Sequence, residues 1–200
     1  MNPIVLNSAD VRYPALLRKR MGADAPPELT ALGNLDLLAL SKTALFCSAH
    51  CPGKVILATY DQAAKWRDAG RCVISGFHSP VEKECLQILL RGSQPIIICP
   101  ARTLPQRVPP DWKKPLAAGR LLVLSAFAAT ANRITADLAS RRNEFVAALA
   151  DEVFIAHATP GGQLDSLNAR LTTHRAAATQ AHCGLTPNEI KLVEQSITAA

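Results

Sequence analysis

The residue types best suited to binding chemistry lie between residues 141 and 163. Arg142 and Asn143 precede an apolar run at 153–156, which is followed by Pro160-Gly161-Gly162-Gln163. This order predicts a helix, a buried strand, and a glycine turn that opens a second helix. Backbone N–H groups at the start of a helix bind anions, and the guanidinium of Arg142 suits a phosphate. The stretch therefore predicts a nucleotide or phosphate site.

Small polar residues also end other apolar runs of the chain, each of which is typical of a buried strand. Parallel strands place their carboxyl ends on one edge of a sheet, and ligands bind in the crevice there. We therefore expect one crevice to gather the residues that follow these runs: Ser48, His50, Ser75, Gly76, Ser125, Gly161 and Gly162.

The elements that must position these residues alternate along the chain. Apolar runs predict strands at 42–49, 71–77, 94–99, 120–127 and 151–158, and helical spacing predicts helices at 55–69, 80–90, 132–149 and 161–173. This alternation predicts an α/β fold, a Rossmann-like doubly wound and mostly parallel sheet with helices on both faces.

The remaining segments are assigned from their turn and capping residues. Four prolines predict an extended surface loop over 101–119, residues 176–181 a short last strand, and Thr186 the start of a terminal helix. The expected organisation is an N-terminal extension at 1–40 packed on the core, a Rossmann-like domain at 41–184, and a C-terminal helix at 185–200.

Composition limits the class of protein. With 200 residues, 48% of them hydrophobic, the chain is long enough for one well-buried α/β domain. No apolar run approaches the roughly 20 residues of a membrane span, so we expect a soluble, cytoplasmic protein without membrane contact. The formal net charge of +6 favours polyanionic partners.

The six cysteines do not predict a metal site, a disulfide or another bound cofactor. No Cys-x-x-Cys pair exists, and Cys47, Cys72 and Cys99 lie in or beside apolar runs. A cysteine in such a run behaves as a small buried hydrophobic residue.

Five pieces of the sequence, taken in order, resemble the DNA-processing protein A (DprA/Smf) family. They are Tyr13-Pro14 with Pro26-Pro27 and Gly33-Asn34-Leu35, the strand end at Cys47-Ser48-Ala49-His50, Val73-Ile74-Ser75-Gly76, Leu122-Val123-Leu124-Ser125, and the helix containing Arg141-Arg142-Asn143-Glu144. The resemblance implies a Rossmann-like domain that binds single-stranded DNA and helps hand it to a recombinase.

The chain departs from the family pattern at several positions. Cys47-Ser48-Ala49-His50 replaces Gly-Ser-Arg, Phe77-His78-Ser79 replaces Gly-Ile-Asp, Glu144 replaces a motif arginine, and Ala139-Ser140 stands where the family has an aromatic residue. A histidine is mostly neutral at pH 7, and an aromatic residue is a stacking platform for bases. We therefore expect fewer contacts to DNA than in relatives.

The segment Pro160-Gly161-Gly162 also resembles the Pro-Gly-Gly-x-Gly-Thr motif of the lysine-decarboxylase-like (LOG) phosphoribohydrolases, which are related to the DprA fold. That motif continues to a catalytic glutamate, whereas residues 163–168 here contain only Asp165 as a carboxylate. Glycosidic hydrolysis needs a positioned carboxyl group. The sequence therefore favours a binding role over an enzyme.

The sequence thus predicts binding of single-stranded DNA in DNA processing or recombination. A binder or sensor of a nucleotide in the same crevice is the alternative, and a nucleotide N-glycosidase is third. In each case Ser48, His50, Ser75, Gly76, Arg142, Asn143, Gly161, Gly162 and Gln163 are the predicted ligand-binding residues. A recombinase partner and a homodimer are left open.

Overall fold

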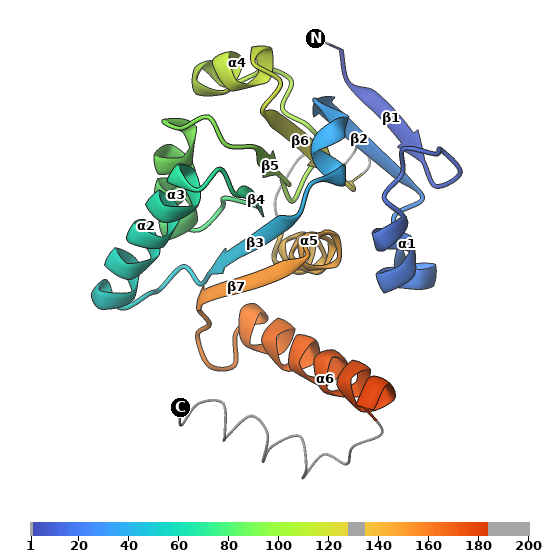
Figure 1. The fold of residues 1–200 in the computed structure, drawn as a ribbon, viewed down its shortest axis with the longest axis vertical. Coiled ribbons are helices and arrows are strands. Elements are labelled where there is room, and N and C mark those ends of the chain that lie inside the picture. Colours follow the sequence, from blue (N-terminus) through green and yellow to red (C-terminus); the bar gives the residue numbers. More distant parts are fainter. Residues whose placement is uncertain (1, 128–134, 184–200) are drawn as a thin grey trace.

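The computed structural model describes residues 2–127 and 135–183 (Figure 1). Its strands are β1 (Ile4–Asn7), β2 (Glu28–Gly33), β3 (Lys42–Cys47), β4 (Cys72–Ser75), β5 (Ile96–Ile98), β6 (Leu121–Ser125) and β7 (Glu152–His157). Its helices are α1 (Ala15–Met21), α2 (Gly53–Asp68), α3 (Pro80–Leu90), α4 (Pro110–Ala117), α5 (Ala136–Leu149) and α6 (Gln163–Cys183), with short 3-10 helices η1 (Gly22–Asp24) and η2 (Leu35–Ala39).

Side-chain caps set where α3 and α5 begin. The Ser79 hydroxyl accepts a hydrogen bond from the Glu82 amide (3.3 Å), and the Glu82 carboxylate accepts one from the Ser79 amide (3.3 Å). With Pro80 as the first helical residue, this is the predicted capping box. Thr135 caps α5 by accepting a bond from the Leu138 amide (3.2 Å).

The strands form one sheet in the order β1-β2-β6-β5-β4-β3-β7. The five strands from β3 to β7 are parallel, whereas β1 and β2, from the N-terminal segment, extend the sheet antiparallel beside β6. The chain steps outward from β3 through β4 and β5 to β6, and then returns to the other side of β3 as β7. The direction of winding therefore reverses between β3 and β7, the position where such sheets bind ligands.

Helices cover both faces of this sheet (Figure 1). Side chains alternate along each strand, so Ile97 packs toward the face of α1, α5 and α6, whereas its neighbours Ile96 and Ile98 pack toward α2, α3 and α4. The predicted α/β fold with a mostly parallel, two-sided sheet is confirmed.

The prediction of an extended loop over 101–119 was partly wrong, because α4 occupies Pro110–Ala117. Pro110 is the first helical residue, where the missing N–H is not needed and the fixed φ favours a helix. Only Pro115 lies deeper, in a helix of eight residues, where a proline removes one hydrogen bond. Prolines therefore shortened this helix without preventing it.

The prediction of a strand at 176–181 was also wrong, because α6 continues to Cys183. The segment is rich in alanine, the strongest helix former, and no glycine or proline separates it from the preceding turns of α6. The predicted start of α5 at 132 and the terminal helix from Thr186 lie outside the described residues.

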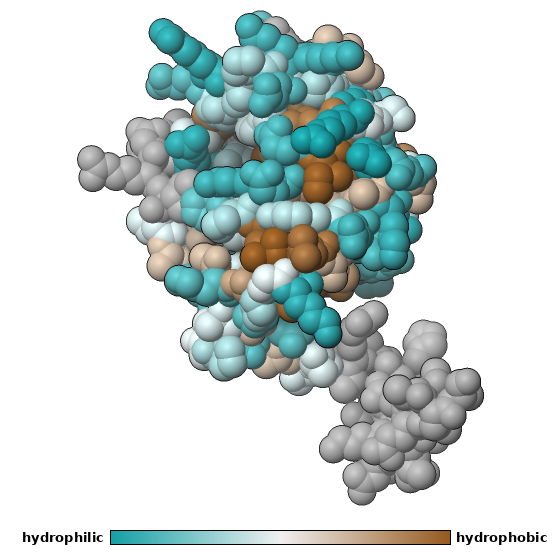
Figure 2. Space-filling view, turned by 90° about the vertical axis from the view of Figure 1, so that its left-hand side faces the viewer, coloured by the Kyte–Doolittle hydropathy of each residue, from teal (hydrophilic) through white to brown (hydrophobic). Residues whose placement is uncertain are grey.

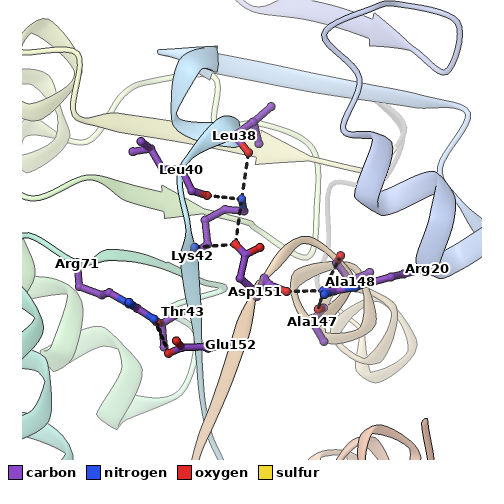
Figure 3. Close-up of polar contacts among 11 residues, drawn as sticks. Arg20, Leu38, Leu40, Lys42, Thr43, Arg71, Ala147, Ala148, Asp151 and Glu152 are labelled. Atoms are coloured by element: carbon purple, nitrogen blue, oxygen red, sulfur yellow. Dashed lines mark hydrogen bonds and ion pairs between the residues drawn. The ribbon is translucent and has the colours of Figure 1, made fainter. Parts of the chain in front are cut away.

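Paired charges fix the amino end of the parallel strands (Figure 3). The ammonium group of Lys42, which is 5% exposed, donates to the carbonyl oxygens of Leu38 (3.0 Å) and Leu40 (2.5 Å) and lies 3.4 Å from a carboxylate oxygen of Asp151. Beside it, Arg71 forms an ion pair with Glu152 and donates to the Thr43 hydroxyl (2.7 Å). These contacts tie the first residues of β3, β4 and β7 together.

The face that carries α2 is mostly hydrophilic, with separate hydrophobic patches (Figure 2). Leu57 on α2, for example, is 66% exposed. Over the part of the chain that the structure describes, no helix combines the length and apolar character that crossing a bilayer requires.

Candidate functional site

Arg142 reaches from α5 under the end of β4. A Cβ atom added to Gly76 would lie 1.2 Å from Nη1 of Arg142, so the guanidinium occupies the space that any larger residue at position 76 would fill. Nη1 also donates to the carbonyl oxygen of Cys99, just after β5, at 3.4 Å. The structure therefore brings Gly76 and Arg142, both predicted ligand-binding residues, into direct contact.

The charge of Arg142 is buried and is not neutralised by a carboxylate at contact distance. Arg142 is 4% exposed, and none of the ion pairs within the described residues includes it. Its Nε donates to the Oδ1 of Asn143 (2.8 Å), which orients the guanidinium. Burial lowers the pKa of Arg142, an effect that the charge of Glu82 opposes, yet an arginine remains charged at neutral pH. A buried cation that has no carboxylate in contact with it favours an additional anionic ligand.

Further cations surround the turn that follows β4. Burial lowers the pKa of His78, and the charges of Arg142, Lys83 and Arg102 lower it further, against the opposing charge of Glu82. His78, Lys83 and Arg102 are all exposed to solvent. We call Arg142, Lys83 and Arg102, together with the His78 imidazole that is mostly neutral at pH 7, the cationic cluster.

Two buried serines, Ser75 and Ser125, form hydrogen bonds to the backbone just after their strands. The hydroxyl of Ser75 accepts a hydrogen bond from the Phe77 amide (3.1 Å), and that of Ser125 accepts one from the Phe127 amide (3.2 Å). Both serines are at most 1% exposed. Their hydroxyls thus hold the turns after β4 and β6. Phe77 has a φ of 47°, a left-handed conformation that is uncommon for an aromatic residue and needs such support.

Ser48 joins the end of β3 to the end of β7. Its hydroxyl accepts a hydrogen bond from the Thr159 amide (3.0 Å), and its own amide donates to the His157 carbonyl oxygen (2.9 Å). The Thr159 hydroxyl in turn lies 3.5 Å from the carbonyl oxygen of His50. His50 is exposed at this junction. The structure therefore brings Ser48 and His50 beside the 159–162 turn, as the strand ends predicted.

The backbone amides of the glycine turn before α6 are already hydrogen-bonded within the turn and the first turn of α6. The Gly161 amide donates to the carboxylate of Asp165 (2.9 Å), and the Gly162 amide donates to the Thr159 carbonyl oxygen (2.9 Å). Gly161 has a φ of 72°, and a Cβ at Gly162 would lie 2.9 Å from the Thr159 oxygen, so both glycines meet local needs. A phosphate at Gly161 must displace the Asp165 carboxylate. Gln163 donates from Nε2 to the Ala136 carbonyl oxygen (2.7 Å), which links α6 to the start of α5.

Sequence reasoning missed a connection made by Glu82. The sequence identifies this residue only as part of a capping box, yet its carboxylate also accepts hydrogen bonds from the Cys47 amide (3.0 Å) and the His78 amide (2.8 Å). Gly76 and Arg142 lie on one side of this bridge, and Ser48 with the 159–162 turn lies on the other. Glu82 therefore joins the two halves of the predicted site.

Lys83 and Arg102 were also missed as site residues. Each lies a few residues beyond the carboxyl end of a predicted strand, β4 or β5, and that position was the available signal. Lys83 looks in sequence like a surface charge of α3. Arg102 falls in a segment that was assigned to a surface loop.

One groove on the described part of the chain lies elsewhere and contains none of the predicted site residues. It has a volume of about 800 Å³ and lies among α1, α5 and α6, where Met21, Ala147, Leu167 and Leu171 line it. These residues lie toward the end of α5, away from the turns that follow the parallel strands.

The cysteines belong to the hydrophobic core. Cys47, Cys72 and Cys99 are buried, as predicted, and burial raises the pKa of Cys99 to about 12, which keeps the thiol protonated. Within residues 2–127 and 135–173, no three side chains of the metal-ligating types gather.

Comparison with known proteins gives one family and a set of solved structures. The sequence model of a family described as DNA recombination-mediator protein A matches residues 4–193. Among curated proteins, none matches the sequence.

Two of the similar solved structures come from bacteria. DNA processing protein A from Streptococcus pneumoniae superposes with a TM-score of 0.69 at 22% identity, over 84% of this chain and 59% of that one. DNA processing protein A from Helicobacter pylori, described as having a unique mode of binding single-stranded DNA, superposes with a TM-score of 0.62 at 20% identity, over 82% of this chain and 73% of that one. The chain thus spans about three-fifths of the Streptococcus protein, and the likeness shows a shared fold.

Proposed function

The chain belongs to the DNA recombination-mediator protein A family, and from this premise we propose that it binds single-stranded DNA through phosphates at the carboxyl end of its parallel sheet. The observation that carries the proposal is the buried guanidinium of Arg142, packed against Gly76 without an acidic partner among the described ion pairs. A guanidinium that is already oriented by Asn143 loses little freedom when a phosphate binds.

The cationic cluster provides the remaining charge for a strand. Lys83 and Arg102 are exposed beside His78, so they can pair with phosphates that do not enter the crevice. Such contacts position a strand without reading its bases. We therefore expect binding with little sequence preference and a marked dependence on salt.

The two halves of the site have different roles in this proposal. Gly76, Arg142 and Asn143 contact the phosphate in the crevice, while His50 lies exposed at the β3–β7 junction along the path of the strand. Ser75, Ser48 and Gln163 hold the backbone of the site through their hydrogen bonds. Gly161 contributes its amide only where a phosphate replaces the Asp165 carboxylate, and the Gly162 amide stays bonded to the Thr159 carbonyl oxygen.

The proposal also names a partner and a cellular location to test. The family description as a recombination mediator makes a recombinase the expected recipient of the bound strand. A homodimer is the second association to test. A cytoplasmic location is part of the proposal. Co-sedimentation on a recombinase filament and light scattering of the purified protein address the two associations.

The decisive experiment measures affinity for a fluorescein-labelled (dT)20 oligonucleotide by anisotropy at low salt. Arg142→Gln is compared with Arg141→Gln, because Arg141 is the exposed neighbour with the same charge on the same helix. We expect Arg142→Gln to weaken binding by about 1.5–3 kcal/mol, as for a lost charged hydrogen bond, and Arg141→Gln to change it by less than about 0.5 kcal/mol.

Two results would contradict the proposal. Equal losses in both variants would show that binding follows net charge and not this crevice. Absence of oligonucleotide binding at low salt, with a nucleoside monophosphate raising the melting temperature, would replace DNA by a free nucleotide as the ligand.

A further inference from the structure

Glu82 is a buried carboxylate whose hydrogen bonds exceed what a helix cap requires. It is 4% exposed, and a capping box needs only its bond from the Ser79 amide. The same carboxylate also accepts bonds from the Cys47 amide at the end of β3 (3.0 Å) and from the His78 amide after β4 (2.8 Å). Three backbone N–H groups from two strand ends therefore converge on one side chain.

The negative charge of Glu82 is unfavourable for the ligand that the crevice is proposed to bind. A carboxylate near a phosphate repels it, and this repulsion is larger in a buried site than in water. None of the ion pairs within the described residues includes Glu82. The charge of Glu82 does act on Arg142 and His78 from a distance, but the hydrogen bonds of its carboxylate all go to backbone amides, which points to a geometric role.

The segment that Glu82 holds is the one that needs support. Phe77, with its left-handed φ of 47°, lies between Gly76 and His78. The Phe77 amide is bonded to Ser75, and the His78 amide is bonded to Glu82, so the two bonds fix the turn on both sides. The Cys47 amide, bonded to the same carboxylate, precedes Ser48, which contacts Thr159.

We propose that Glu82 is a positioning residue of the phosphate site, which sets the Gly76–His78 turn against the Cys47–Ser48 strand end so that one anion can contact both. This inference rests on the proposed function. It makes the two halves of the site dependent on one side chain that does not contact the ligand.

The sign of the effect distinguishes positioning from electrostatics. Glu82→Gln removes a negative charge beside the site, so electrostatics alone predicts tighter binding of an anion. The amide, however, has one oxygen where the carboxylate has two, and its NH₂ group faces a backbone donor. Positioning therefore predicts weaker binding.

The experiment measures (dT)20 affinity by anisotropy and stabilisation by inorganic phosphate in thermal melts. Three variants are compared with the unmodified protein: Glu82→Gln, the exposed neighbour Glu84→Gln as a charge control, and Ser79→Ala as a control that weakens the α3 cap but keeps the carboxylate. We expect Glu82→Gln to weaken (dT)20 binding about five- to tenfold, Glu84→Gln to leave it unchanged or slightly tighter, and Ser79→Ala to lower the melting temperature with affinity kept within about twofold.

If Glu82→Gln does not fold, Glu82→Asp carries the same comparison, because it keeps the charge and shortens the reach by one methylene. Tighter or unchanged binding in a folded Glu82 variant, or an equal loss in Ser79→Ala, overturns the inference. If (dT)20 fails to bind the unmodified protein, the proposed function is overturned. The inference is still supported in that case when inorganic phosphate raises the melting temperature of the unmodified protein but not that of the Glu82 variant. If neither probe binds the unmodified protein, both proposals fail.

Discussion

The two ends of the parallel sheet hold buried charge in opposite ways. At the amino end, the ammonium of Lys42 has two carbonyl oxygens and the Asp151 carboxylate around it, and Arg71 is paired with Glu152 (Figure 3). At the carboxyl end, the guanidinium of Arg142 has an amide and a carbonyl oxygen around it and no carboxylate among the described ion pairs.

This difference indicates that the charges at the amino end of the sheet stabilise the fold, whereas the charge at the carboxyl end is available to bind a ligand. A buried charge with its partners present contributes to a fixed structure, and removing one partner is costly. A buried charge without an acidic partner lowers stability but offers its full interaction to an incoming anion. Substitutions at the amino end should therefore change stability, and those at the carboxyl end should change binding.

The largest expected effect is on stability, from Lys42→Met at the amino end. The substitution keeps most of the side-chain volume but leaves the Leu38 and Leu40 carbonyl oxygens and Asp151 without their cation. We expect a loss of about 3 kcal/mol in the free energy of unfolding, at the lower end for a broken buried pair because Asp151 is partly exposed. Urea unfolding measures it.

The control for that variant is Lys65→Met, which removes the same charge from the exposed surface of α2. It should change the free energy of unfolding by less than about 0.5 kcal/mol. Oligonucleotide affinity of folded Lys42→Met, measured below its melting temperature, should stay within about twofold. A loss of affinity as large as that of Arg142→Gln would break the distinction between the two ends.

A smaller effect, mainly on binding, is expected from Gly76→Ala at the carboxyl end. The added Cβ would lie 1.2 Å from Nη1 of Arg142, so the guanidinium must move out of its position. We expect (dT)20 affinity to fall by about 2 kcal/mol, the cost of losing a charged hydrogen bond. Anisotropy measures it, with circular dichroism melts to check folding.

Gly53→Ala is the matched control, because a Cβ at Gly53 meets no atom within 4 Å. This variant should bind (dT)20 like the unmodified protein. If Gly76→Ala retains full affinity, Arg142 does not contact the ligand from the position seen here.

The smallest expected effect is a pH dependence at His78. Its pKa in the folded protein is lowered from 6.5, first by burial and then by Arg142 and the other cations. The stability contributed by neutral His78 is therefore fully present above pH 6.5 and declines as pH falls through the folded pKa. A bound phosphate favours the charged imidazole, so (dT)20 affinity should rise as pH falls below 6.5.

Titrations at several salt concentrations measure this gain. One added phosphate contact at low pH should make the slope of log affinity against log salt steeper by about 0.7. His78→Gln should abolish the gain, whereas His50→Gln should preserve it. The reverse result would assign the acid response to the β3–β7 junction.

Much of the fold follows from local patterns. The apolar runs beginning at Lys42 and Arg120 and the capping box at Ser79 were identified because strand alternation and helix capping depend on residues close in sequence. The proline-rich segment before Gly119 and the alanine-rich end of α6 were misjudged, since a few local residues there allow more than one element. Local patterns also did not reveal that β1 and β2 join the sheet beside β6.

For the site, the sequence by itself determined which residues follow the carboxyl ends of the strands, and so predicted that Ser48 and Gly76 lie in one region; Arg142 was predicted as a phosphate ligand from its place on a helix. Only the tertiary structure decided how they meet. Arg142 fills the space beside Gly76, Asp165 takes the Gly161 amide, and Glu82 binds two strand ends. Strand order and register decide which of these residues meet. The free energy of each contact is set by its burial and by partners from distant parts of the chain.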